Sequence, residues 1–196
     1  MRKPGLVLGI AFIGVVAACG KDAIDPVTGG EGSGSEGFSV LLTDDPGLED
    51  ATLQGTVTGA IRVGLRNDAG FLVSLGVADD VELPLHEGDT IRLSGLSRPP
   101  VDDYTAVQLR FEGVDVAVDA GSQVGDSTLA NDVTLDVGGA GAATVDVLVP
   151  VFGVDNSSVM EIVVDLNSEA WVTGANLDDH VVPQADLANS VLVEVN

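Results

Sequence analysis

The stretch YTAVQLRFEGVDVAVD, residues 104–119, alternates apolar and polar side chains along most of its length. Apolar residues occupy every second position from Val107 to Phe111, and valines resume the alternation after Gly113. Successive side chains of a β-strand point to opposite faces, so this pattern predicts strands with one buried face and one face in solvent. Glycine inside such a pattern favours a bulge or a bend, which we place at Gly113.

The same alternation recurs along the rest of the chain. It is clearest in four further segments: residues 133–137, 145–149, 162–166 and 191–195. Less regular apolar segments indicate additional strands at residues 38–42, 52–63, 71–77 and 90–93. Sequences rich in Gly, Pro, Asn and Asp separate these segments and predict turns. About nine or ten short antiparallel strands joined in this way predict an all-β fold, an antiparallel β-sandwich.

Helical periodicity is weak throughout the chain. No segment of useful length carries apolar residues at helical spacing, and PQADLANS, residues 183–190, is expected to hold one helical turn at most. Aromatic residues make up only 4% of the chain, and the single cysteine, Cys19, precedes the expected strands. The folded region therefore contains no disulfide, and we expect closely packed aliphatic side chains to hold it together.

The first residues are typical of an export signal. Arg2 and Lys3 precede an apolar run over residues 6–18, which is shorter than the roughly 20 residues that a membrane-spanning helix needs. The run ends in VAAC, with small residues before Cys19. This ending resembles the bacterial lipobox, in which the cysteine is lipidated and becomes the first residue of the mature chain. We predict a lipoprotein signal peptide over residues 1–18 and a lipid anchor on Cys19.

Residues 19–37 contain the predicted lipidated cysteine and a linker rich in Gly, Ser and acidic residues. Such a composition has little apolar surface to bury and is typical of a flexible tether. The alternative is an ordinary cleavage site that leaves Cys19 as an unpaired thiol, which an oxidising compartment disfavours. We expect an extracytoplasmic protein anchored by lipid to the cell envelope, with residues 38–196 as the β-sandwich domain. Gly20 and Lys21 favour the outer membrane if the cell is Gram-negative.

The chain is strongly acidic, with 31 Asp and Glu residues against eight Lys and Arg and a formal net charge of −23. Nucleic acids and anionic lipids are bound mainly through Lys and Arg, so this charge argues against nucleic acid as a partner. The lipid anchor remains the expected link to the membrane. An acidic surface of this kind favours solubility and attracts multivalent cations.

The opening of the domain resembles a known family, the domain of unknown function 4382. FSVLLTDDPGLEDATLQGTVTGAIRV, residues 38–63, is similar to the strand, turn and second strand with which that family begins. The matching positions are Leu42, Thr43, Asp44, Pro46, Thr58 and Gly59. Asp45 stands where the family usually has alanine, and the middle of the domain differs in spacing.

Three later segments extend this resemblance to most of the domain. DDYTAVQLRFEGVDVAVD, EIVVDLNSEAWV and LANSVLVEV, beginning at Asp102, Glu161 and Leu187, are similar in order to the family's central strand and closing segments. The resemblance implies a secreted or lipid-anchored β-sandwich of prealbumin-like or immunoglobulin-like type. It brings no catalytic residues with it.

Pairs of adjacent aspartates suggest a cation site. Four such pairs fall at expected turns, and three of them are candidate calcium ligands: Asp44, Asp45, Asp102, Asp103, Asp178 and Asp179. Calcium prefers several carboxylate or carbonyl oxygens around one point, and turns of a sandwich gather at its two ends. The alternative is that each pair lies in a solvated turn and caps the backbone. No calcium-loop spacing is present.

One short motif suggests a hydrolase. GDSTL, residues 125–129, is similar to a block of some esterases, which would make Ser127 a nucleophile with His180 as its base. That block belongs to an α/β fold and precedes a helix, so we predict a turn serine here and no enzymatic activity. His86 and His180 are expected in exposed loops, and Trp171 in the core.

These observations favour a non-catalytic surface module. It would bind or scaffold a protein or glycan partner through loops displayed on a rigid frame. Two alternatives remain open: a calcium-binding envelope protein that uses the aspartate turns, and a hydrolase.

Overall fold

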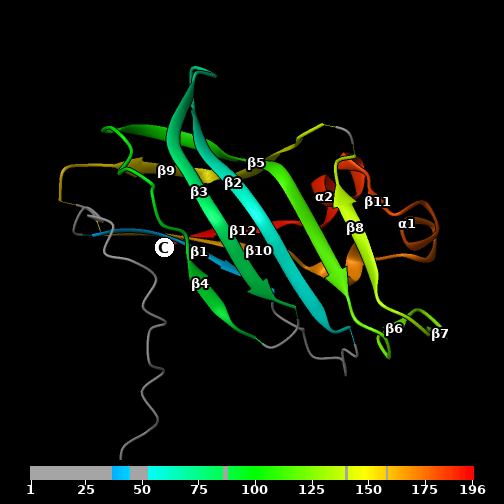
Figure 1. The fold of residues 1–196 in the computed structure, drawn as a ribbon. Coiled ribbons are helices and arrows are strands. Elements are labelled where there is room, and N and C mark those ends of the chain that lie inside the picture. The colour runs from blue at the N-terminus through cyan, green and yellow to red at the C-terminus, as the bar shows by residue number, and fades with distance from the viewer. Residues whose placement is uncertain (1–36, 45–52, 86–87, 140, 158) are drawn as a thin grey trace, which may run out of the picture.

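The computed structural model describes residues 37–44, 53–85, 88–139, 141–157 and 159–196. The signal peptide, the lipid anchor at Cys19 and most of the linker lie outside these ranges, so they stay predictions. Asp45 and His86 also lie outside them. The described chain is mostly β-structure, which forms a sandwich-like arrangement of two main sheets (Figure 1). The predicted all-β sandwich is therefore confirmed.

The smaller sheet, sheet A, has four strands in the order β12-β10-β1-β4. Their bounds are Leu192–Val195 for β12, Met160–Asp165 for β10, Phe38–Thr43 for β1 and Thr90–Arg92 for β4. Strands β1 and β10 run parallel, whereas β4 and β12 run antiparallel to their neighbours. The expectation of purely antiparallel pairing is wrong for β1 and β10, and also for residues 136–137 and 181–182, which pair in parallel. More than a hundred residues separate β1 from β10, which leaves ample chain for the crossover that parallel pairing requires.

The larger sheet, sheet B, has six strands in the order β11-β8-β5-β2-β3, with β9 also paired to β5. Their bounds are Val181–Val182 for β11, Val133–Val137 for β8, Asp102–Val118 for β5, Gly55–Asn67 for β2, Leu72–Pro84 for β3 and Ala143–Val154 for β9. A separate hairpin joins β6, Gln123–Val124, to β7, Ser127–Thr128. Every predicted strand overlaps an observed one. The two-residue strands were too short to predict from alternation.

Strand β5 is the longest strand and the centre of sheet B. One of its edges pairs with β2 along nearly its full length. The other edge is shared, because residues 102–111 pair with β9 and residues 115–118 pair with β8. This strand contains the alternating stretch that predicted the fold, and its apolar side chains form the middle of the core.

Gly113 introduces the predicted irregularity into β5. Thr58 pairs with Asp115 and Ala60 with Glu112, so β5 has one residue more than β2 at this point. The additional residue changes the buried core positions from the odd-numbered Val107, Leu109 and Phe111 to even-numbered positions, beginning at Val114. Both halves of the strand therefore bury their apolar side chains on the same face of the sheet.

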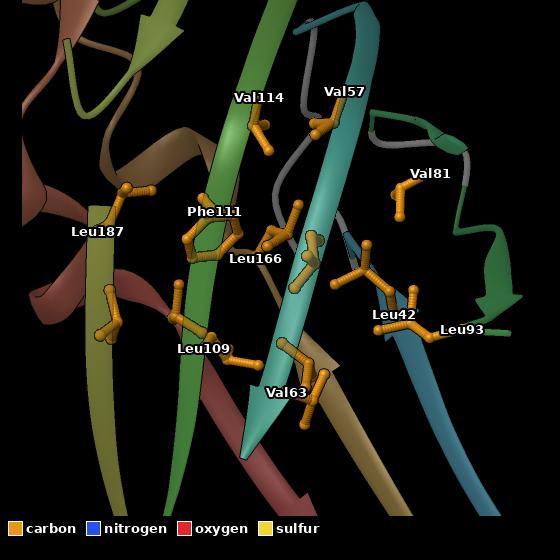
Figure 2. Packing of buried hydrophobic residues seen from close by; sticks show 14 of the residues in the cluster. Leu42, Val57, Val63, Val81, Leu93, Leu109, Phe111, Val114, Leu166 and Leu187 are labelled. Atoms are coloured by element: carbon orange, nitrogen blue, oxygen red, sulfur yellow. The ribbon is translucent and has the colours of Figure 1, made fainter. Parts of the chain in front are cut away.

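The core lies between the two sheets. Figure 2 shows Leu42 from β1, Val63 from β2, and Leu109 and Phe111 from β5 directed toward one interior region. Their side chains are at most 1% exposed. Burial of one such aliphatic or aromatic side chain contributes about 1.5–3 kcal/mol to folding. Aliphatic packing between two sheets is therefore the main source of stability, as the composition predicts.

Three short helical segments close one end of the sandwich: η1 (Ser168–Ala170), α1 (Gly174–Asp179) and α2 (Gln184–Ser190). The prediction of one helical turn at most in 183–190 is wrong, because α2 has seven residues, about two turns. Only Leu187 anchors α2 deep in the core, at 1% exposure. The other buried residue of α2 is Ser190, so only one apolar side chain is buried, and a single apolar residue produces no periodic stripe in the sequence. No helix within the described ranges is long and apolar enough to cross a membrane.

Candidate functional site

Asp44 is buried, unlike the solvated turn residue that the sequence suggested. It follows β1 and is 1% exposed. Its Oδ1 accepts a hydrogen bond of 2.8 Å from the backbone N–H of Ser168, and its Oδ2 accepts one of 2.6 Å from the Ser168 hydroxyl. Hydrogen bonds to a charged acceptor each contribute about 1.5–3 kcal/mol. This carboxylate therefore holds η1 against the end of sheet A.

Asp102 and Asp103 lie at the start of β5, beside the hairpin that joins β2 and β3. The Asn67 side-chain amide donates a 2.9 Å hydrogen bond to Asp102 Oδ2. This bond, together with the backbone N–H of Asp103, lowers the pKa of Asp102 below its ordinary value. The backbone carbonyl of Asp103 accepts a hydrogen bond from the N–H of Asp68, so the pair fixes the base of the hairpin.

The remaining aspartate pairs lie elsewhere. Asp178 and Asp179 are exposed at the end of α1. Asp79 and Asp80 are not in a turn, since they lie inside β3 at a bulge where Asp80 has a φ of 56°. No group of three or more His, Cys, Asp or Glu side chains is gathered for a metal ion in the described part of the chain. The calcium prediction therefore gains no support from the described aspartates.

Ser127 and His180 show no catalytic arrangement. Ser127 is exposed on the β6–β7 hairpin. His180 ends α1 with a φ of 58°, and its Nδ1 lies 3.3 Å from the carbonyl oxygen of Thr134, so the ring faces β8. Among the described residues, no hydrogen bond joins Ser127 to His180.

Trp171 is a core residue, as expected, with 1% exposure. Its Nε1–H donates a 2.9 Å hydrogen bond to the carbonyl of Leu166. The side-chain amide of Asn176 donates to the carbonyl of Trp171 and, over 3.1 Å, to Asp186 on α2. Polar contacts of this kind satisfy the buried groups around the indole, so Trp171 holds the helical end together.

One small pocket lies near this end of the molecule. It has a volume of about 200 Å³ and is lined by Leu53, Gln123, Val124, Gly125, Glu169 and Val172. Typical pockets for small ligands have volumes of roughly 300–1,000 Å³. It is therefore too small to hold a ligand of ordinary size.

The outer face of sheet B carries an unusual group of charges. The domain from residue 38 onward contains five arginines and no lysine, and three of those arginines lie on this face. We call the group the arginine face and define it by side chains from three neighbouring strands: Arg62, Arg66, Gln108, Arg110, Glu112 and Asp146. In a chain with a net charge of −23, this concentration of arginine marks the face as distinct from the rest of the surface.

Two of these arginines share one carboxylate oxygen. Arg62 and Arg110 are direct cross-strand partners, and like charges in that position repel. Glu112 offsets the repulsion, since its Oε1 lies 3.2 Å from Arg62 Nε and 3.0 Å from Arg110 Nε. The two guanidinium groups are thereby held side by side. The arginine side chains remain 46% and 51% exposed.

The third arginine belongs to a second, more enclosed group. Arg66 Nη2 lies 3.2 Å from Asp146 Oδ1, and Arg66 Nη1 donates to the carbonyl of Gly70 over 3.1 Å. The Gln108 amide donates to the same Asp146 oxygen over 2.9 Å. Asp146 therefore neutralises Arg66, whereas one carboxylate serves both Arg62 and Arg110.

Exposed apolar side chains border the arginine face. Leu72 and Leu148 lie at the two ends of one row across β3, β2, β5 and β9, with Arg66 and the buried Ala106 between them. Leu72 is 47% exposed and Leu148 is 83% exposed. Leu72 also leans over β2, because its Cδ1 lies 3.0 Å from the place where a Cβ on Gly64 would be. The face thus combines positively charged guanidinium groups with exposed apolar side chains at its border. This combination is suited to binding.

Sequence reasoning missed this site. The alternation of residues 104–119 places Arg110 on the outward side of its strand, but the strand predicted at residues 52–63 ends before Arg66, so Arg62 and Arg66 were not predicted to share a face. Their four-residue spacing in GAIRVGLRN, with valine and leucine between, is a usable signal, because it places both arginines on the same outward face of a strand. Their position beside Arg110 depends on strand order, which alternation alone does not specify.

Comparisons of the chain with models of protein families, with curated proteins and with solved structures found no match. The resemblance to the domain of unknown function 4382 therefore remains a prediction based on the quoted segments.

Proposed function

We propose that this protein is a non-catalytic binding module, anchored to the cell envelope through a lipid on Cys19 and held outside the cytoplasm on an acidic linker. The apolar run before Cys19, the small residues next to it and the composition of residues 20–37 support the anchor and the tether. Display on a tether suits a protein that meets a partner at the cell surface or in the periplasm.

The arginine face is the observation on which the binding function rests. It lies on the central strands of a well-packed sheet, so its side chains are held by a rigid frame. Isolated surface ion pairs contribute about 0–1 kcal/mol to stability, so folding alone gives little reason to concentrate arginine here. Recognition of an anionic partner is a better explanation, since paired guanidinium groups suit carboxylates and other oxyanions.

The anchor is tested with Cys19→Ser in the full chain. We expect the wild-type protein to incorporate an azide-labelled fatty acid and to sediment with membranes. The Cys19→Ser chain should lose both properties, because the thioether is the only predicted attachment. Ser127→Ala serves as a matched control and should behave like the wild type. A Cys19→Ser protein that still sediments with membranes contradicts the anchor.

The binding function is tested by photocrosslinking in intact cells. A benzophenone amino acid replaces Leu148, which is largely exposed beside the arginine face, or Glu194, which is exposed on sheet A as a control. We expect a discrete adduct, identified by mass spectrometry, from position 148 and none from position 194. Absence of an adduct from both positions, or turnover by the purified protein on a panel of hydrolase substrates, would count against a non-catalytic binding module.

A further inference from the structure

We propose that the arginine face docks an extended acidic segment of a partner protein, with a carboxylate on Arg62 and Arg110 and apolar side chains over Leu72 and Leu148. This inference rests on the proposed binding function and names the chemistry of the partner.

The first step is the hydrogen-bonding capacity that the two arginines retain. Both direct their Nε toward Glu112 Oε1. Within the described residues, no hydrogen-bond acceptor is seen for their Nη groups, so up to four N–H donors on each half-exposed side chain remain for a partner. Two planar forks side by side bind a carboxylate in the bidentate geometry that guanidinium groups favour. With Glu112 counted, this group of three side chains retains one positive charge.

The second step is charge complementarity. Elsewhere the chain is dominated by acidic residues, which repel an acidic partner. An acidic segment is therefore attracted to the arginine face and repelled by the surfaces around it. A basic partner would meet the opposite distribution and would bind almost anywhere else on the molecule. The charge pattern thus favours binding of an acidic partner at the arginine face.

The third step is the spacing along the strands. Gly64, over which Leu72 leans, lies two residues from Arg62, a distance of about 7 Å along a strand. Leu148 is in the row of Ala106, four residues from Arg110 and about 13 Å away. An extended peptide directs residues i, i+2 and i+4 to one side at these intervals. Leu72 reaches over β2 from one side and Leu148 lies on β9 at the other side, so a segment with an acidic residue followed by two apolar residues at alternate positions fits along β2 and β5 between them.

The probe is the blocked peptide acetyl-Glu-Thr-Leu-Thr-Leu-amide, titrated into the full chain and followed by NMR. We expect the Nε–H signals of Arg62 and Arg110 and the methyl signals of Leu148 to shift together with one Kd. Replacement of the glutamate by glutamine in the peptide should weaken binding about tenfold, the loss expected for one charge-assisted hydrogen bond.

The matching protein variant is the double substitution Arg62→Gln with Arg110→Gln. It should also raise the Kd of the glutamate peptide about tenfold. Arg92→Gln removes one arginine on β4 in sheet A and should leave the Kd unchanged, which shows that loss of an arginine elsewhere does not weaken binding. An unfolded variant is recognised by the collapse of its amide spectrum, and the glutamine peptide on the wild-type chain then carries the test.

Three outcomes would overturn the inference. One is an unchanged Kd in the double variant. Another is that inorganic phosphate shifts the arginine signals with the same affinity as the peptide while Leu148 stays unmoved, which means that only a small anion binds. The last is a dimer in analytical ultracentrifugation that the double substitution abolishes, which means that a second copy occupies the face. A crosslinked partner at position 148 alongside any of these outcomes would leave the proposed function standing.

Discussion

The outer face of sheet B differs on the two sides of Gly113. Before this residue, β5 carries Arg110 and Glu112 in a network of opposite charges with β2. After it, Asp115 of β5 lies directly opposite Asp136 of β8, and neither carboxylate has a cation partner among the described side chains. The inner faces of the two halves are equally buried. The core thus has the same apolar character in both halves, while the charge pattern outside differs, and the proposed binding would use that difference.

The largest expected effects come from the inner faces, where the halves should not differ. Leu109 lies under the arginine face and Leu135 under the acidic half, and both side chains are fully buried. The test replaces each of them with alanine. Each substitution should lower the free energy of unfolding by about 2–5 kcal/mol, because it removes buried methyl groups and leaves a cavity. Urea unfolding measures the loss. If only one of the two substitutions lowered the free energy of unfolding by this amount, the single shared core would be contradicted.

Alternation in the sequence predicted this shared core well. Period-two valines require nothing more than local geometry, so residues such as Val116 and Ile162 could be assigned to the interior directly. The buried aspartate could not be assigned in this way. Asp44 is enclosed by Ser168, more than a hundred residues away, and that contact depends on the parallel pairing of β1 with β10.

The arginine face could not be predicted from the sequence for a similar reason. Outward positions on β2 and β5 follow from alternation, but the cross-strand pairing of Arg62 with Arg110 depends on the bulge register at Gly113. Local patterns specify which side of a strand a residue faces. They do not specify its neighbour on the next strand, and sites made from neighbouring strands are missed for that reason.

The bulge that divides the two halves gives the next largest effect. Gly59 lies opposite it with a φ of 140°, and a Cβ there would lie 2.6 Å from the carbonyl oxygen of Gly113. Gly59→Ala should therefore lower the free energy of unfolding by about 1–3 kcal/mol. Gly141→Ala, where an added Cβ meets nothing within 4 Å, is the control and should change it little. Equal effects in thermal unfolding would show that the bulge does not constrain Gly59.

The free energy of unfolding should change in opposite directions when charges in the two halves are neutralised. Glu112→Gln leaves Arg62 and Arg110 facing each other without their shared carboxylate and should lower the free energy of unfolding by about 0.2–1 kcal/mol. Asp136→Asn relieves the repulsion with Asp115 and should raise it by a similar amount. Both differences should shrink in 1 M salt, which screens exposed charges. Changes of the same sign, or changes insensitive to salt, would contradict the contrast.

The smallest effect concerns Asp102, at the hairpin end of the arginine half. Its pKa is lowered mainly by the Asn67 side chain, so Asn67→Ala should raise that pKa toward its ordinary value. A lowered folded-state pKa stabilises the fold above the unfolded-state pKa, and this stabilisation is lost as the pH falls through the folded-state value. The substitution should therefore remove a little stability at neutral pH and none at very low pH. NMR titration of the Asp102 carboxyl in the wild-type and Asn67→Ala chains measures the shift, and an unmoved Asp102 would show that Asn67 does not hold the carboxylate.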